Sequence, residues 1–225
     1  MTWLANLYRS AIGKKAVMAV TGLILFGFVF VHMAGNLKVY LGPEHFNAYA
    51  EALRELFTPI VPREGALWIA RLVLIVAVIF HIHSAYALTM MNREARPIDY
   101  RDREYVKGTY AARTMRWGGV IILVFIIYHL LHFTTGQAHP DFVRTDPYHN
   151  FVSGFRVWWV SAFYILANLA LGLHLYHGVW SMFASLGVTH KRFEQWRRVF
   201  ATVFAVLITV VNLSFPISVL LGIVR

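Results

Sequence analysis

The sequence predicts an all-α integral membrane protein, a single domain of residues 1–225 with five transmembrane helices. Two observations lead to this fold class. Of the 225 residues, 58% are hydrophobic and only 14% are charged, whereas soluble domains contain about 25% charged residues. The apolar residues also form five blocks, and each block reaches the roughly 20 residues that a helix needs to cross a bilayer.

The five apolar blocks define the predicted membrane spans. They cover residues 16–40, 66–91, 115–135, 157–186 and 199–223. After the first span, Pro43-Glu44-His45 followed by residues 46–56 predicts a short amphipathic helix, which ends near Pro59 and Pro62. After the third span, residues 137–153 are polar and contain two prolines. We expect both connections to lie at the membrane interface.

Lysine and arginine gather in alternate connections, and this pattern predicts the orientation in the membrane. The N-terminal stretch and the connections after the second and fourth spans are rich in basic residues, whereas the other two connections hold few. Because basic residues stay on the cytoplasmic side, we predict a cytoplasmic N-terminus and an external C-terminus. The formal net charge of +10 then reflects topology, and we expect no nucleic-acid partner. The basic residues of these three regions are Arg9, Lys14, Lys15, Arg93, Arg96, Arg101, Arg103, Lys107, Arg113, Lys191, Arg192, Arg197 and Arg198.

The chain contains no cysteine. This excludes disulfides, thiolate-held iron–sulfur clusters, thiolate-ligated haem and c-type haem attachment within it. Any iron–sulfur chemistry must therefore belong to a partner.

Histidine is concentrated in the apolar blocks. Seven of the eleven histidines lie in the first four spans and none in the fifth: His32, His81, His83, His129, His132, His174 and His177. An ionisable side chain in the hydrocarbon region is unfavourable and indicates a functional site. A hydrogen bond to a neighbouring helix explains one such histidine, but it explains seven on four helices poorly.

Helix direction sorts four of these histidines into two depths. At about 1.5 Å per residue, His32 and His129 lie roughly 6–10 Å below the predicted outer face. His83 and His174 lie roughly 27 Å from that face, near the inner one. Imidazoles from facing helices are the usual axial ligands of low-spin haem b. The depths therefore predict two haems, one held by His32 and His129 and the other by His83 and His174.

Other pairings remain open at this point. His132 and His177 share nearly the same helix faces as His129 and His174, and His81 points away from His83. A site for a metal ion alone would need three or four ligands at one depth. A proton relay would need acidic residues, which the spans almost lack.

The chain resembles the cytochrome b membrane subunit of succinate dehydrogenases and fumarate reductases. The similarity is to the single-chain, five-helix, two-haem type often called the cytochrome b558 subunit. It covers essentially the whole chain, and it depends on several short motifs in order and at the right spacing. The motifs are Phe30-Val-His-Met-Ala-Gly-Asn-Leu37, His83-Ser-Ala-Tyr86, Tyr128-His-Leu-Leu-His-Phe133 and Leu173-His-Leu-Tyr-His-Gly-Val-Trp-Ser181, with Phe46-Asn-Ala-Tyr-Ala-Glu-Ala-Leu53 between the first two.

The resemblance implies specific ligands and partners. His83 and His174 would hold an inner, proximal haem, and His32 and His129 an outer, distal haem. A flavoprotein subunit and an iron–sulfur subunit would bind on the cytoplasmic face of a bacterial inner membrane. Electrons would pass from them through the two haems to a quinone near the outer face. The chain itself would not act on succinate.

The resemblance also implies a carboxylate near the outer haem. Glu51 and Glu55 are candidates for the quinone site, with His45, His139 and His149 as further candidates. Arg71 lies toward the outer end of the second span and is a candidate partner for a haem propionate. Two alternatives stay open on the sequence. One is a di-haem cytochrome b of the hydrogenase or formate dehydrogenase type, and the other is a haem-free anchor or transporter.

Overall fold

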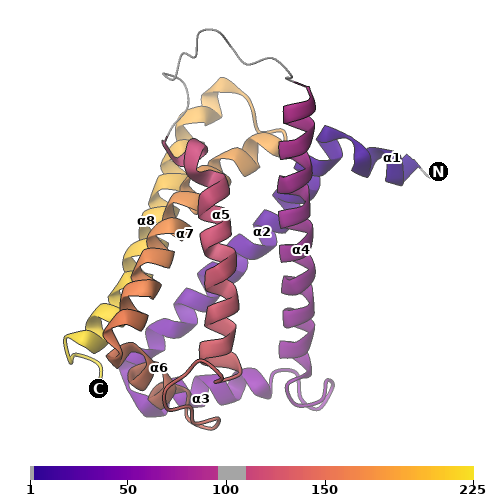
Figure 1. Ribbon diagram of the computed structural model, residues 1–225. Coiled ribbons are helices and arrows are strands. Elements are labelled where there is room, and N and C mark those ends of the chain that lie inside the picture. Colours follow the sequence, from indigo (N-terminus) through magenta and orange to yellow (C-terminus); the bar gives the residue numbers. More distant parts are fainter. Residues whose placement is uncertain (1–2, 96–109) are drawn as a thin grey trace.

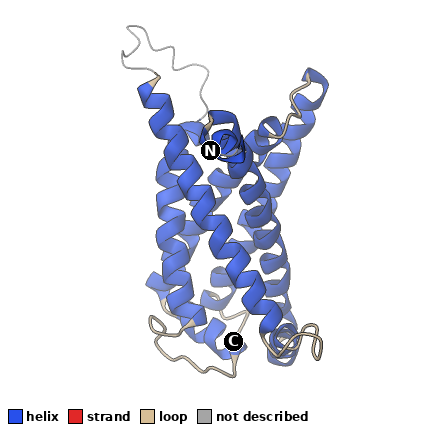
Figure 2. Ribbon diagram, turned by 90° about the vertical axis from the view of Figure 1, so that its right-hand side faces the viewer, coloured by secondary structure: helices blue, strands red, loops and turns tan. Residues whose placement is uncertain are grey.

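A computed structural model describes residues 3–95 and 110–225, which are helical throughout their regular elements and contain no strand (Figures 1 and 2). Five of the described segments are long and apolar enough to cross a membrane. Each of them overlaps one predicted span, so the all-α, five-span prediction is confirmed. The segments are Ala11–Leu41, Gly65–Glu94, Met115–Thr134, Trp158–Ser185 and Lys191–Leu220.

The regular elements of the described chain are eight α-helices and three short 3₁₀- or π-helical turns. The turn Leu37–Leu41 extends α2, the π-helical turn Leu130–Thr134 extends α5, and the turn Lys191–Phe193 precedes α8. With the labels of Figure 1, the helices are α1 Trp3–Arg9, α2 Ala11–Asn36, α3 Pro43–Arg54, α4 Gly65–Glu94, α5 Tyr110–His129, α6 Pro147–Arg156, α7 Trp158–Ser185 and α8 Glu194–Leu220.

Two spans begin earlier than hydropathy predicts, because polar residues start them. The side chain of Ser10 accepts a hydrogen bond from the backbone N–H of Gly13 and caps α2 at 3.0 Å. In the first turn of α8, Glu194 pairs with Arg197 and Arg198. These ion pairs let the helix start in a charged segment before the apolar block.

The connection between the first two spans contains the amphipathic helix that the sequence predicts: α3 begins at Pro43, as expected, and ends at Arg54. Both α3 and α6 carry proline in their first turn, where the missing N–H costs nothing. Helix α6 was not predicted. The two helices lie at the same end of the bundle as the C-terminus (Figure 1). They are joined by Asn47, which donates to Asp146 at 2.9 Å and accepts from the N–H of Tyr148 at 2.9 Å.

The bundle is held together by four main helix contacts. Helix α4 packs along α2, α5 along α7, and α7 along α8, while α2 crosses α7. The described core forms two clusters. One lies toward the α3–α6 end and includes Val39, Phe151 and Phe215, and the other includes Met33, Leu175 and Ile208. The four spans that carry histidines thus pack in the order α4, α2, α7 and α5.

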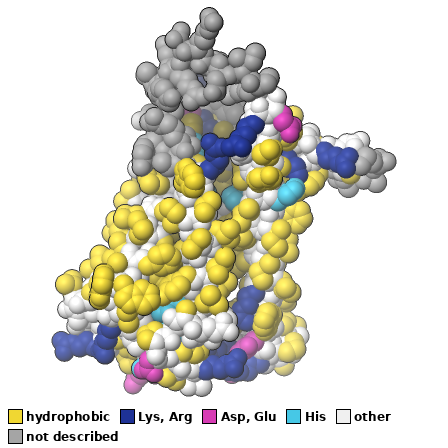
Figure 3. All heavy atoms as spheres, in the orientation of Figure 1, with side chains coloured by type: hydrophobic (Ala, Val, Ile, Leu, Met, Phe, Trp, Pro, Cys, Tyr) yellow, Lys and Arg dark blue, Asp and Glu magenta, His cyan; other side chains and the backbone are white. Residues whose placement is uncertain are grey.

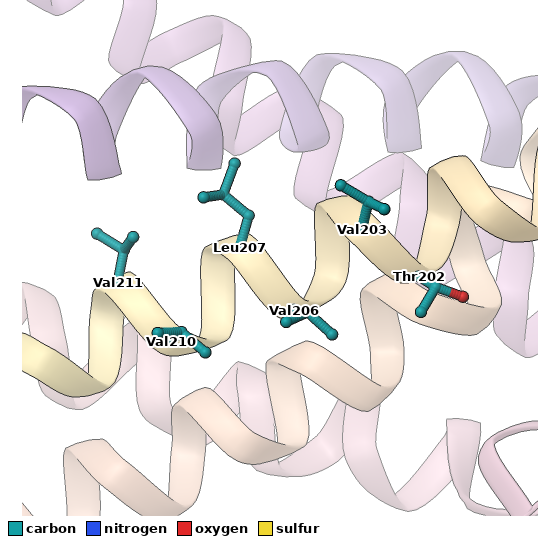
Figure 4. A pocket seen from close by; sticks show the side chains of 6 residues that line it. All are labelled: Thr202, Val203, Val206, Leu207, Val210 and Val211. Carbon is teal, nitrogen blue, oxygen red and sulfur yellow. The ribbon is translucent and has the colours of Figure 1, made fainter.

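The outer surface matches a membrane environment. Hydrophobic side chains cover the middle of the visible face, and Lys and Arg gather near its two ends (Figure 3). A shallow apolar groove of about 430 Å³ runs along α8 (Figure 4). It contains no histidine and only one polar side chain, Thr202, so it does not belong to the histidine sites.

The two ends of the chain lie at opposite ends of the bundle (Figure 1). This agrees with an odd number of spans, whereas the predicted cytoplasmic side remains a prediction. Part of the basic second-to-third connection lies outside the described residues: Arg96, Arg101, Arg103 and Lys107, together with the side chain of Arg113.

Candidate functional site

One predicted histidine pair is brought together, with His32 exposed at the surface of the bundle and His129 half-buried. His32 on α2 and His129 on α5 have ring centroids 5.8 Å apart, and their ring planes are nearly perpendicular at 84°. Their helices are not neighbours in sequence. The matching depths inferred from helix direction therefore correspond to an actual approach of the two rings.

The second pair involves a different residue of α4 from the one predicted. The ring of His174 on α7 lies 6.3 Å from that of His81, centroid to centroid. His83 instead bonds through Nδ1 to the hydroxyl of Tyr8 at 2.7 Å and stacks on its ring. Residues two apart on a helix point about 200° apart, so His81 and His83 cannot face the same neighbour. The side-chain arrangement therefore pairs His81, rather than His83, with His174.

Both ring separations suit a metal held between two imidazoles. With bonds of about 2 Å from metal to nitrogen, two axial imidazoles have ring centroids about 6 Å apart. Among the described residues, no group of three or more His, Asp or Glu side chains is arranged to bind a metal ion. Two-ligand sites of this kind suit a haem, because the macrocycle itself supplies the other ligands.

The second ring nitrogens of these histidines have specific surroundings. His129 Nδ1 lies 3.2 Å from the hydroxyl of Tyr164, and His81 Nδ1 lies 3.2 Å from that of Thr21. Such contacts orient a ligand and leave its other nitrogen for the metal. His174 Nδ1 is buried without a hydrogen-bond partner among the described residues. For His129 and His81, the contacts at Nδ1 therefore leave Nε2 as the nitrogen that fits a bound metal.

Glycines border the pair formed by His81 and His174. A methyl group at Gly22 would lie 3.4 Å from Cε1 of His81, and one at Gly119 would lie 4.0 Å from Cε1 of His174. A larger side chain at either position would reach the ring. Small residues here keep the space around the imidazoles open to a flat group, although close packing of membrane helices also uses glycine.

Two independent measures give the same spacing between the pairs. On α7, Tyr164 contacts His129, and His174 follows ten residues later. On α2, Thr21 contacts His81, and His32 follows eleven residues later. At about 1.5 Å per residue, both helices place the two pairs roughly 15 Å apart along the helix axis.

The alternative histidines have other roles in the structure. His132 is fully buried, with Nδ1 3.0 Å from the hydroxyl of Tyr164. It stacks on His139 at 4.7 Å between ring centroids. Both nitrogens of His139 are held by the backbone of Asn150 and Asp141. His177 packs edge-on against the ring of Trp180.

The candidates for the quinone site lie at the α3–α6 end. Glu51 accepts hydrogen bonds from Arg54 and Arg63, and the bond from Arg63 is the main cause that lowers the pKa of its carboxyl. His45 and Glu55 are both exposed, and they lie at opposite ends of α3: His45 is in its first turn and Glu55 follows its last residue. His149 pairs with Asp141 at 2.9 Å. Of these candidates, Glu51 is already engaged by two guanidinium groups.

Arg71 lies in the second turn of α4, toward its N-terminal end, and is half-buried. Its guanidinium carbon is 4.8 Å from the ring centroid of Trp68, one turn earlier on the helix. This contact holds the guanidinium group near the N-terminal end of α4.

Several residues of the site were missed by sequence reasoning. Tyr164 and Thr21 are polar groups inside apolar spans, and such positions are the signal that could have drawn attention to them. Tyr8 lies in α1, a helix that was not predicted. Its ring lies between His83 and the ammonium group of Lys14, which is 3.4 Å from the ring centroid.

The fold and the site define a polytopic membrane protein with two pairs of facing histidines at different depths. The family model of the succinate dehydrogenase/fumarate reductase transmembrane subunit matches residues 92–213, more than half of the chain. The chain belongs to this family. The match includes His129 and His174, whereas His32, His81 and His83 precede it. No curated protein and no solved structure matches the chain.

Proposed function

We propose that this chain is the membrane-anchoring cytochrome b subunit of a succinate:quinone oxidoreductase, with two b haems. The identity of the complex is proposed from the family to which the chain belongs. The observation that carries the haem proposal is the approach of two histidine pairs, at 5.8 and 6.3 Å between ring centroids. The family match also favours this function over a hydrogenase or formate dehydrogenase cytochrome.

The proposed ligands are His32 and His129 for the outer haem. For the inner haem we propose His174 with His81, in place of the His83 that the motif comparison implied. The support is the ring contact of His81 with His174 and the engagement of His83 by Tyr8. When bound, the haems would supply one-electron chemistry between the partner iron–sulfur subunit and a quinone.

The other residues of the chain have supporting roles in this proposal. Tyr164 and Thr21 orient two of the ligand rings, and the apolar bundle excludes water from them. Arg71 is proposed to pair with a propionate of the outer haem, because it is the arginine in the outer part of α4.

The partners are proposed from the family and from the charge pattern. The flavoprotein and iron–sulfur subunits would dock at the end that holds α1 and the connection between α7 and α8, on the cytoplasmic face. Lys191 and Arg192 are exposed there. The quinone would react at the opposite end, near α3. We propose Glu55 and His45 for that site, and we assign Glu51 to the clamp with Arg54 and Arg63.

The test of the function is the haem content of the purified, haem-replete protein. We expect two haems per chain, with two low-spin ferric signals in electron paramagnetic resonance spectra. One haem per chain would contradict half of the proposal. A protein without a b-type α band in the reduced-minus-oxidised spectrum would support the haem-free anchor instead.

The inner ligand is tested by a matched pair of variants on α4. We expect His81→Leu to retain one haem and to lose the inner signal, because a ligand is removed. We expect His83→Leu to retain both haems, because only the contact with Tyr8 is lost. The opposite result would restore His83 as the ligand.

A further inference from the structure

We propose that Tyr164 is a positioning residue that sets the ring orientation and the donor strength of His129. This inference rests on the proposed function, since it concerns the outer haem ligand. The hydroxyl of Tyr164 lies between two imidazoles, 3.2 Å from Nδ1 of His129 and 3.0 Å from Nδ1 of His132. It thus connects a proposed ligand to a second, fully buried histidine.

The tyrosine is held rigidly. Its side chain is only 4% exposed. Phe125 and Phe155 pack edge-on against its ring, with centroids 5.0 and 4.9 Å away and interplanar angles of 86° and 89°. A ring confined in this way cannot swing its hydroxyl away from the two imidazoles. The two contacts of the Tyr164 hydroxyl, with His129 and with His132, therefore form a bridge that core packing holds in place.

The number of protons on the three groups decides which group donates in each hydrogen bond of the bridge. A histidine that binds a metal through Nε2 carries its proton on Nδ1 and can only donate there. The Nδ1–H of His129 then donates to the oxygen of Tyr164. The single hydroxyl proton of Tyr164 is left to donate to Nδ1 of His132. A phenol that donates in this way is a better acceptor for the first bond, because bonds in a chain polarise one another.

At the far end of the bridge, His132 is held by ring contacts, and its Nε2 is buried without a hydrogen-bond partner among the described residues. His132 stacks between Tyr128 and His139, with interplanar angles of 17° and 24°. His139 is fixed in turn, because it bonds to the carbonyl of Asn150 at 2.8 Å and accepts from the N–H of Asp141 at 3.0 Å. His132 therefore holds its Nδ1 toward Tyr164.

At the inner pair a different hydroxyl, that of Thr21, contacts Nδ1 of His81 at 3.2 Å. The Nδ1 of His174 is buried and has no hydrogen-bond partner among the described residues. An acceptor on the ring N–H raises the basicity of a ligating imidazole. A more basic ligand stabilises the ferric state and lowers the reduction potential. Removing the hydroxyl of Tyr164, which contacts His129 and His132, should thus affect the outer haem alone.

The experiment compares Tyr164→Phe with Tyr128→Phe. Both variants remove one buried hydroxyl from the same aromatic cluster, in which the two rings are 6.1 Å apart. The hydroxyl of Tyr128 has no hydrogen-bond partner among the described residues, so it is a matched control. Potentiometric titration gives both haem potentials, and electron paramagnetic resonance reports the orientation of the axial rings. The inner haem is an internal reference.

We expect Tyr164→Phe to raise the potential of the outer haem and to shift its resonance signal, with the inner haem unchanged. Tyr128→Phe should change neither haem. A second variant, His132→Leu, keeps the tyrosine but removes its acceptor, and should raise the outer potential by a smaller amount.

Three results would overturn the proposal. One is an unchanged outer potential and signal in Tyr164→Phe with both haems bound. Another is an equal shift in Tyr128→Phe, and the third is an equal shift of both haems. Each of these leaves the proposed function intact, because the haem content is unaltered. A wild-type protein without haem would instead overturn the proposed function together with this inference.

Discussion

At the scale of single residues, His81 and His83 differ in their neighbours although they are two positions apart. His81 contacts Thr21 and the ring of His174, and His83 contacts Tyr8. The motif around His83 resembles the family, and depth alone suits either residue. The rotation of α4 about its axis distinguishes them, because it turns one face toward α2 and α7.

Glu51 is a second residue whose surroundings alter its interpretation. The sequence predicts a candidate for the quinone site, but its carboxylate is bound by Arg63 and Arg54. These bonds lower the pKa of Glu51 from its ordinary value. A carboxyl group with a lowered pKa stays ionised at neutral pH and is a poor proton donor. The clamp therefore indicates a structural role between α3 and α4.

We predict that Glu51→Gln and Arg63→Gln cause the same small loss of thermal stability, with quinone reduction retained. Because the pKa of Glu51 is lower in the folded protein, its stabilising effect is present above the ordinary carboxyl range. That effect is lost as the pH falls through the lowered value. Unfolding in detergent between neutral and acidic pH measures it. Loss of quinone reduction in Glu51→Gln alone, with intact haem spectra, would return Glu51 to the quinone site.

At the scale of helices, the contact between α7 and α8 depends on one glycine. Gly172 is buried, and a methyl group there would overlap Oγ1 of Thr209 on α8. Thr209 is held in place, because its hydroxyl donates to the carbonyl of Ala205 at 2.7 Å. Gly178 lies on the same helix, and a methyl group there would meet nothing within 4 Å. The two glycines therefore lie on the same helix and differ in how closely α8 packs against them.

We predict that Gly172→Ala destabilises the protein by about 1–3 kcal/mol, because overpacking forces the helices apart. Gly178→Ala should leave stability unchanged or raise it slightly, because alanine favours a helix more than glycine does. Thermal unfolding of both variants in the same detergent provides the comparison. Equal stabilities of the two variants would show that the α7–α8 contact accommodates the added methyl group without a loss of stability.

At the scale of the whole molecule, the two termini lie at opposite ends of a bundle whose sides are apolar (Figures 1 and 3). The orientation in the membrane is predicted from basic residues, with the α1 end in the cytoplasm. This orientation also decides which end faces the soluble partners. It can be tested directly, because the chain has no cysteine of its own.

We predict that Thr145→Cys reacts with a membrane-impermeant maleimide on intact cells whose outer membrane is permeabilised. Thr189→Cys should react only after the inner membrane is opened. Both threonines are exposed, in connections at opposite ends of the bundle. The cysteine-free parent protein is the background control. The reverse labelling pattern would invert the topology and the proposed docking face.

The sequence by itself determined the five spans, the absence of thiolate ligands and the family. These features depend on hydropathy, composition and short motifs, which can be read along one dimension. The tertiary structure decided which ring faces which: His81 with His174, Tyr164 between His129 and His132, and Glu51 with Arg63. The physical reason is that each contact depends on how far a helix is rotated about its axis. Packing against neighbouring helices sets that rotation, and no local pattern in the chain contains it.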